Sequence, residues 1–169
     1  MEKMTKKKDK VQLYLAHPIL DRREVRDWEL GFEKFFTDID LFNPFYDSHD
    51  SGEERAVQAL DNSNATIYYD WEFSKKIVTR DLNAVRRTEG TIAFLGGHST
   101  IGTIMEICYA WNWGKPVFVI APQTTGDKSF PLGNHPWIQY HSTRTFDSFN
   151  KFEDFIKTGG LKNALHKKR

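Results

Sequence analysis

One carboxylate stands alone in an apolar stretch that has the composition of a buried helix. Residues 102–113 read GTIMEICYAWNW, and Glu106 is the only acidic side chain among them. Placing a charge on such a surface is costly unless the group is paired or lies in a solvated pocket. The dipole near the helix N-terminus offsets only about 0.3–1 kcal/mol of that cost. We therefore expect Glu106 to line a ligand cleft, and an ion-paired glutamate on an exposed stripe is the alternative.

The turn before this helix has the composition of an anion-binding site. Its glycines let backbone N–H groups approach a phosphate at the start of the helix, and its hydroxyl groups add hydrogen-bond donors. Glycines also simply make turns, so the pattern is weak by itself. The residues concerned are Gly96, Gly97, His98, Ser99, Thr100 and, at the start of the helix, Gly102.

Two further side chains fall where a ligand could bind. Asp81 lies in a helix expected over residues 71–87, although charges on helices are more often solvated than functional. His17 directly follows a strand expected at residues 11–16. It could be a ligand or an acid–base group, but histidines at strand ends are more often structural or exposed. Neither residue by itself indicates which reaction the protein catalyses.

The elements that must position these residues alternate between strands and helices. Short apolar runs predict the strands, and apolar residues at helical spacing predict the helices. Such alternation is typical of an α/β fold with a mostly parallel sheet covered on both faces, and ligands bind these sheets at the carboxyl ends of the strands. The expected strands are residues 11–16, 39–42, 91–95, 117–121 and 137–140, and the expected helices are 22–36, 55–60, 71–87, 102–113 and 149–157.

Length and charge are those of an ordinary globular protein. The 169 residues fit one domain, which we place at residues 11–160 between basic tails at 1–10 and 161–169. A net charge of +1 gives no reason to expect a nucleic-acid polymer or a membrane surface as partner. No apolar run reaches the length of a membrane span.

The cysteine and histidine content argues against disulfides and metal sites. Cys108 is the only cysteine, which excludes an internal disulfide and any multi-cysteine metal site. A reducing, cytoplasmic setting is the expectation that follows. The six histidines show no recognised ligand spacing, so we expect no metal site.

Several motifs together resemble the nucleoside 2-deoxyribosyltransferase family, which includes related nucleoside 5′-monophosphate N-glycosidases. Their order and spacing agree from residue 11 to about residue 139. The resemblance implies a flavodoxin-like, doubly wound fold with a five-stranded sheet, and a homodimer or higher homo-oligomer with shared active sites. It also implies a small nucleoside or nucleotide substrate and no cofactor. The motifs are YLAHP at 14–18, NPFYD at 43–47, RDL at 80–82, GTIMEICYA at 102–110, GKPVFVI at 114–120 and NHPW at 134–137.

The resemblance also implies roles for four residues. Glu106 would be the nucleophile that forms a covalent glycosyl-enzyme intermediate, and Asp81 would contact the base and the sugar near the reacting bond. Tyr14 would orient the nucleophile or pack against the ligand, and Asn134 would reach the active site of a neighbouring subunit. A second base as acceptor gives transfer and water gives hydrolysis, and the motifs leave that choice open.

One departure from the family pattern points to a phosphorylated substrate. The transferases commonly have an aspartate six residues before the nucleophile, where it engages the sugar 5′-hydroxyl, whereas this chain has Thr100. A neutral hydroxyl does not repel a 5′-phosphate and can donate a hydrogen bond to it. We therefore expect a nucleoside 5′-monophosphate, with a free deoxynucleoside as the alternative. Further phosphate ligands could be Arg22 and Arg23 after the first strand, Ser129 from a neighbouring subunit, and His98.

Other features leave alternatives open. His17 stands where the family often has a small residue, so it could narrow the pocket or contact phosphate. The glycine pair and Glu106 also resemble the phosphoribohydrolases that activate cytokinin nucleotides, although Leu95 stands where those enzymes have a proline. A non-catalytic nucleotide sensor would use the same pocket without releasing base. A plain scaffold protein would have no use for Glu106 on an apolar helix.

Overall fold

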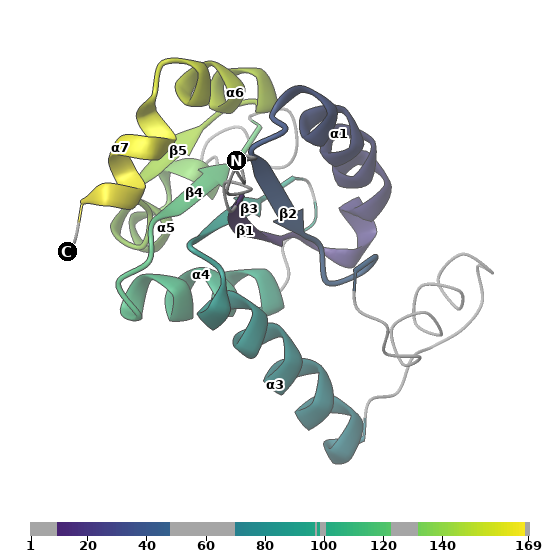
Figure 1. Ribbon diagram of the computed structural model, residues 1–169. Coiled ribbons are helices and arrows are strands. Elements are labelled where there is room, and N and C mark those ends of the chain that lie inside the picture. Colours follow the sequence, from purple (N-terminus) through teal and green to yellow (C-terminus); the bar gives the residue numbers. More distant parts are fainter. Residues whose placement is uncertain (1–9, 48–69, 97, 99–100, 123–131, 168–169) are drawn as a thin grey trace, which may run out of the picture.

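Five parallel strands form the sheet at the centre of the protein (Figure 1). A computed structural model describes residues 10–47, 70–96, 98, 101–122 and 132–167. The strand order is β2-β1-β3-β4-β5, and each neighbouring pair is parallel. This is the doubly wound order of flavodoxin-like proteins, in which the connections change direction between β1 and β3. The bounds are β1 Val11–Ala16, β2 Ile39–Phe42, β3 Gly90–Phe94, β4 Val117–Ile120 and β5 Arg144–Phe146.

Helices cover both faces of the sheet (Figure 1). One layer contains α1, α6 and α7, the other contains α3, α4 and α5, and each buries its own apolar cluster against the strands. The short 3-10 helices η1 and η2 precede α1 and α5. The bounds are α1 Arg22–Phe35, α3 Trp71–Arg87, α4 Ile101–Asn112, α5 Pro136–Tyr140, α6 Phe149–Lys157, α7 Gly160–His166, η1 Ile19–Asp21 and η2 Leu132–Asn134.

Strand β1 contributes to both layers at once. Leu13 and Leu15 pack in the cluster of α1 and α6, whereas Tyr14 and Ala16 pack in the cluster of α3 and α4. All four side chains are fully buried. A central parallel strand is covered on both faces, which explains why its sequence is apolar without polar alternation. Tyr14 is the exception, because it carries a hydroxyl group into the α3–α4 layer that needs a hydrogen-bond partner there.

Local signals fix the ends of the two helices that carry Asp81 and Glu106. Asp70 caps α3, where its Oδ1 accepts a hydrogen bond of 2.8 Å from the N–H of Phe73. After α4, Gly114 has a φ of +72°, in the left-handed region that glycine adopts without strain. The predicted bounds of α3 are confirmed, and those of α4 are confirmed to within one residue.

The last strand differs from the prediction. The sequence predicts a strand at residues 137–140, whereas Pro136–Tyr140 form helix α5. Pro136 lies in the first turn, where a backbone N–H has no acceptor within the helix, so the N–H that proline lacks is not needed. The His135 side chain caps the helix by accepting a hydrogen bond from the N–H of Trp137. The strand that completes the sheet is instead β5, which pairs with β4.

The segment expected to be a C-terminal tail is largely helical. Helix α7 covers most of residues 161–169, and Leu161 is 4% exposed within the core cluster that contains α1 and α6. Polar and basic residues lie between the apolar positions of this short helix, so the sequence shows no clear helical pattern there. The helix expected at 55–60 lies outside the described residues, and so does the N-terminal tail apart from Lys10. Within the described ranges, no helix is both long enough and apolar enough to cross a membrane.

Candidate active site

The buried hydroxyl group of Tyr14 has its partner on α4. Tyr14 Oη donates a hydrogen bond of 2.5 Å to Oε1 of Glu106, across the layer between β1 and α4. Burial raises the pKa of Tyr14 well above its usual value, and the negative charges of Glu106 and Asp81 raise it further. The phenol therefore stays protonated at neutral pH and acts as the donor. One oxygen of the Glu106 carboxylate is fixed by this bond.

Glu106 is half-buried in the second turn of α4. The neighbouring Met105 is exposed and Ile107 is fully buried, so Glu106 lies at the boundary between the α3–α4 layer and the surface. A carboxylate in this position loses part of its hydration, and a short hydrogen bond from a buried phenol compensates for that loss. The partial burial and the bond from Tyr14 distinguish Glu106 from a fully exposed glutamate.

Asp81 lies on α3 within electrostatic reach of the same hydroxyl group. Its Oδ1 accepts two contacts from Arg80, at 2.9 Å from Nε and 2.7 Å from Nη2. The charge of Asp81 raises the pKa of Tyr14, whereas the charge of Arg80 lowers it. Strand β1 and helices α3 and α4 therefore bring together Tyr14, Asp81 and Glu106, the three residues that the sequence singles out as catalytic.

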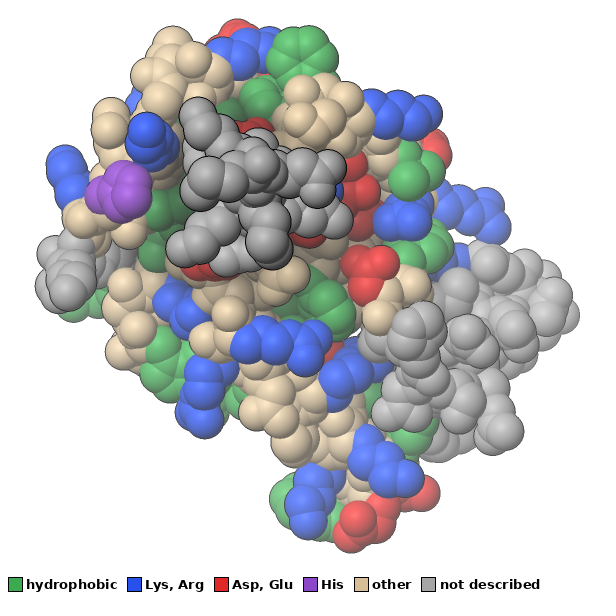
Figure 2. All heavy atoms as spheres, in the orientation of Figure 1, with side chains coloured by type: hydrophobic (Ala, Val, Ile, Leu, Met, Phe, Trp, Pro, Cys, Tyr) green, Lys and Arg blue, Asp and Glu red, His purple; other side chains and the backbone are tan. Residues whose placement is uncertain are grey.

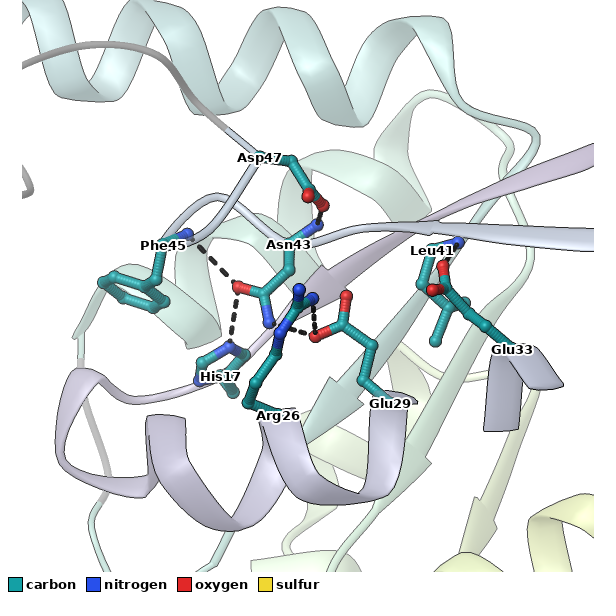
Figure 3. A network of polar contacts seen from close by, with 8 residues as sticks. All are labelled: His17, Arg26, Glu29, Glu33, Leu41, Asn43, Phe45 and Asp47. Carbon is teal, nitrogen blue, oxygen red and sulfur yellow. Dashed lines mark hydrogen bonds and ion pairs between the residues drawn. The ribbon is translucent and has the colours of Figure 1, made fainter. Parts of the chain in front are cut away.

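His17 belongs to a buried polar network at the carboxyl ends of β1 and β2 (Figure 3). The side chain is 3% exposed. Its Nε2 lies 3.1 Å from Oδ1 of Asn43, its Nδ1 lies 3.1 Å from the carbonyl oxygen of Pro18, and its ring packs 4.8 Å from that of Phe45. Burial, the largest effect, lowers the pKa of His17. These contacts favour a structural role for His17 over contact with a phosphate.

Glu29 anchors this network from helix α1 (Figure 3). Its Oε2 accepts hydrogen bonds from Nδ2 of Asn43 at 2.8 Å and from Nη1 of Arg26 at 2.9 Å. Burial raises the pKa of Glu29, and the bonds from Arg26 and Asn43 oppose that effect. Sequence reasoning missed Glu29 as a positioning residue. The sequence does contain a signal for Glu29, which falls at helical spacing from Val25 and Phe32 on the apolar face of α1. Glu106 has the same kind of placement on its helix.

A histidine–aspartate contact lies next to the turn after β3. Nδ1 of His98 is 2.7 Å from Oδ1 of Asp21, which is 7% exposed, while His98 itself is exposed. A methyl group added to Gly96 would lie 3.0 Å from the other oxygen of Asp21, so a side chain at this position would crowd the carboxylate. The pair ties the turn after β3 to the start of α1, at the edge of the sheet where ligands bind in this fold.

Two solved structures of enzymes share this architecture. A 2-deoxyribosyltransferase from Bacillus psychrosaccharolyticus matches with a TM-score of 0.55 at 19% sequence identity, over 85% of this chain and 91% of that chain. A 2-deoxyribosyltransferase from Leishmania mexicana matches with a TM-score of 0.52 at 17% identity, over 87% and 97% of the two chains. This chain has the 2-deoxyribosyltransferase fold. The flavodoxin-like, doubly wound fold expected from the sequence is thereby confirmed.

A CMP N-glycosidase from Clostridium botulinum also matches, with a TM-score of 0.48 at 14% identity over 87% of this chain and 98% of that chain. No protein-family model matches the sequence, and no curated protein is significantly similar to it.

The expected phosphate ligands that the structure describes lie on different elements. Arg22 is buried and donates to the carbonyl oxygen of Ile19 at 2.9 Å, whereas Arg23 is exposed on α1. Gly102 is exposed in the first turn of α4, and Asn134 is exposed at the end of η2. The remaining expected ligands, Ser99, Thr100 and Ser129, lie outside the described residues.

Charged side chains of both signs are interspersed over the face seen in Figure 2. Within the described part of the chain, histidine, cysteine, aspartate and glutamate side chains do not gather in groups of three that could hold a metal ion. The cluster of Tyr14, Asp81 and Glu106 therefore offers carboxylate and phenol chemistry, which is nucleophilic attack and hydrogen bonding.

Proposed function

We propose that this protein cleaves the N-glycosidic bond of a nucleoside 5′-monophosphate or a nucleoside through a covalent glycosyl-Glu106 intermediate. The observation that carries the proposal is the hydrogen bond of 2.5 Å from Tyr14 to Glu106, with Asp81 on the adjoining helix. A carboxylate held by a buried phenol has a defined direction, which attack on an anomeric carbon requires. The 2-deoxyribosyltransferase fold supports this class of reaction.

The reaction takes place in two displacements. In the first, an oxygen of Glu106 bonds to C1′ while the bond from C1′ to the base nitrogen breaks, and the electron pair leaves with the base, which takes up a proton. The charge that develops on the sugar is stabilised by the ionised carboxylate. In the second, water or the nitrogen of another base bonds to C1′ and releases a proton to the solvent, while the electron pair of the ester bond returns to Glu106. Water gives hydrolysis, and a base gives transfer.

A 5′-phosphate is the substrate feature that we propose for this site. Thr100 replaces an acidic residue at the position that faces the sugar 5′-hydroxyl in the transferases, and the turn after β3 leads into the N-terminus of α4. His98 in the turn after β3 and Arg23 in the first turn of α1 are both exposed. Comparing kcat/KM for each common deoxynucleoside with that for its 5′-monophosphate tests this part. A preference for the free nucleoside would make the protein a nucleoside 2-deoxyribosyltransferase or hydrolase instead.

A second copy of the chain completes the site in this proposal. Helix α4 carries an exposed apolar stripe beside Glu106, formed by residues four positions apart: Ile101 is 84% exposed, Met105 46% and Tyr109 36%. On the adjoining α3, Val78 is 54% exposed. Large apolar side chains gathered on neighbouring helices are typical of a protein interface. We infer that two copies meet here and that Asn134 and Ser129 of one copy reach the site of the other.

Substitution of Glu106 tests the chemistry directly. Glu106→Ala and Glu106→Gln should each lower base release by about 10³-fold or more, because the covalent step is lost. Base release is followed by chromatography with each nucleoside and nucleotide, with and without a second base. Intact-protein mass spectrometry of the wild type should show a sugar adduct that the variants lack.

The controls separate the alternatives. Thermal unfolding of the Glu106 variants should show that the fold is kept. Retained activity in a folded variant would place the chemistry elsewhere. Binding of nucleotides by wild type and variants alike, without any release of base, would identify a sensor.

A further inference from the structure

The carboxylates of Glu106 and Asp81 both act on the buried phenol of Tyr14. Two carboxylates that lie this close make it harder for the nucleophile to stay ionised. Glu106 and Asp81 both raise the pKa of Tyr14, so both lie within electrostatic reach of its hydroxyl group. Neighbouring carboxylates disfavour each other's charge, and one of them then tends to hold a proton. A protonated Glu106 is a poor nucleophile. The proposed function, on which this inference rests, therefore requires a way to keep Glu106 ionised.

A counter-charge lies next to one of these carboxylates. Arg80 places two nitrogens at 2.9 Å and 2.7 Å from Oδ1 of Asp81, and the two side chains are only 17% and 15% exposed. Salt and water screen such a half-buried pair much less than a surface pair. The charge of Arg80 also lowers the pKa of Tyr14, against the effect of both carboxylates. The charged or titratable groups that act on one another in this cluster include Tyr14 from β1, Arg80 and Asp81 from α3, and Glu106 from α4.

We propose that Arg80 is a positioning residue that holds Asp81 in the ionised form and thereby allows Glu106 to stay ionised beside it. Asp81 then accepts hydrogen bonds from the substrate, and the proton that the leaving base takes up comes from water. The guanidinium group also orients the Asp81 carboxylate, because both contacts fall on the same oxygen.

Titration of the carboxyl groups tests this role without any turnover. The ¹³C signals of the Asp81 and Glu106 carboxyl carbons are followed between about pH 3 and pH 8 in the wild type and in Arg80→Gln. Loss of the positive charge should move the titration of at least one of the two carboxyl groups upward by about one pH unit or more. Arg80→Lys keeps the charge and should restore most of the wild-type behaviour.

Matched variants keep the result interpretable. Lys75→Gln removes the same charge from an exposed position on the same helix and should leave both titrations unchanged. Arg80→Met, which keeps the length of the side chain, replaces Arg80→Gln if that variant does not fold. Unchanged carboxyl titrations in a folded, neutral Arg80 variant would overturn the proposal.

The pH dependence of kcat/KM gives the second measurement. In Arg80→Gln the acid limb should move upward with the titration of the carboxyl groups, and Arg80→Lys should move it back. A uniform loss of activity without displacement of the limb would indicate a purely structural role and contradict the proposal. If the wild type releases no base at all, the proposed function fails, and the carboxyl titrations still decide the role of Arg80.

Discussion

Buried polar side chains of this protein work in connected groups at the ends of the first two strands. Glu29 is fully buried, and one of its oxygens is shared by Asn43 and Arg26. Its other oxygen, Oε1, has no hydrogen-bond partner within the described structure. Such a carboxylate is costly in its charged form. The network nevertheless connects α1 with the segments after β1 and β2, and the bonds from Asn43 and Arg26 offset part of this cost.

The pH dependence of stability should reveal the cost of Glu29. Its folded-state pKa is raised, so the folded protein holds this proton more tightly than the unfolded chain does. That contribution to stability is present below the ordinary pKa of a glutamate and is lost as the pH rises through the folded-state value. Relative to Glu29→Gln, whose amide does not titrate, the wild type should lose stability as the pH rises from acid to neutral.

Urea unfolding at a series of pH values measures this difference. Glu24→Gln removes an exposed carboxylate from the same helix and should give a difference that barely depends on pH. A Glu29→Gln curve that runs parallel to that of the wild type over the whole range would contradict the prediction.

At the scale of elements, the candidate site depends on how α3 and α4 end. The C-terminal half of α3 packs on the sheet through Ala84 and Val85, whereas its N-terminal half extends beyond the sheet (Figure 1) and leaves Trp71 77% exposed. Helix α4 must stop where the chain turns back into β4. Gly114 makes that turn in the left-handed region, and the N–H of Lys115 donates to the carbonyl oxygen of Ala110 at 3.0 Å.

The same substitution at two glycines should therefore have opposite effects. Gly114→Ala forces a Cβ into a left-handed backbone and should destabilise the protein by about 1 kcal/mol. Gly31→Ala lies in the middle of α1 with open space around the added methyl group, and it should stabilise the protein by up to about 1 kcal/mol. Chemical denaturation of both variants tests the pair. Equal effects in the same direction would show that backbone conformation does not control the end of α4.

At the scale of the whole molecule, one chain leaves apolar surface uncovered next to its candidate nucleophile. The stripe of Ile101, Met105 and Tyr109 is exposed on α4, and Trp137 is 66% exposed on the adjoining α5. Asn134 lies exposed just before α5. A shared active site between two copies would account for both features.

Complementation between two inactive variants tests the shared site. Glu106→Ala and Asn134→Ala should each be inactive alone, and their mixture should regain about a quarter of wild-type activity if the protein is a dimer with one intact site in each mixed pair. Subunits are exchanged by mild denaturation and refolding, and analytical ultracentrifugation measures the mass of each sample. A mixture that stays inactive although mixed dimers form would place Glu106 and Asn134 in the same subunit's site and contradict the shared site.

The sequence by itself determined the alternation of strands and helices, because a buried strand and an amphipathic helix each require a local pattern of apolar residues. It also singled out Glu106, since a charge within an apolar helix is visible without any structure. The prediction of a strand at 137–140 was wrong because the five residues of α5 are too few to show a helical period. The signals that make this segment a helix are the cap by His135 and the proline at 136.

Only the tertiary structure decided which groups meet. The partner of Glu106 lies 92 residues away on β1, and sheet order brings the two together. The contact between Arg80 and Asp81 could not be expected either, because adjacent side chains on a helix diverge by about 100° and meet only when their surroundings bend them toward each other. Pairing across the fold depends on long-range packing, which local patterns of hydrophobicity do not encode.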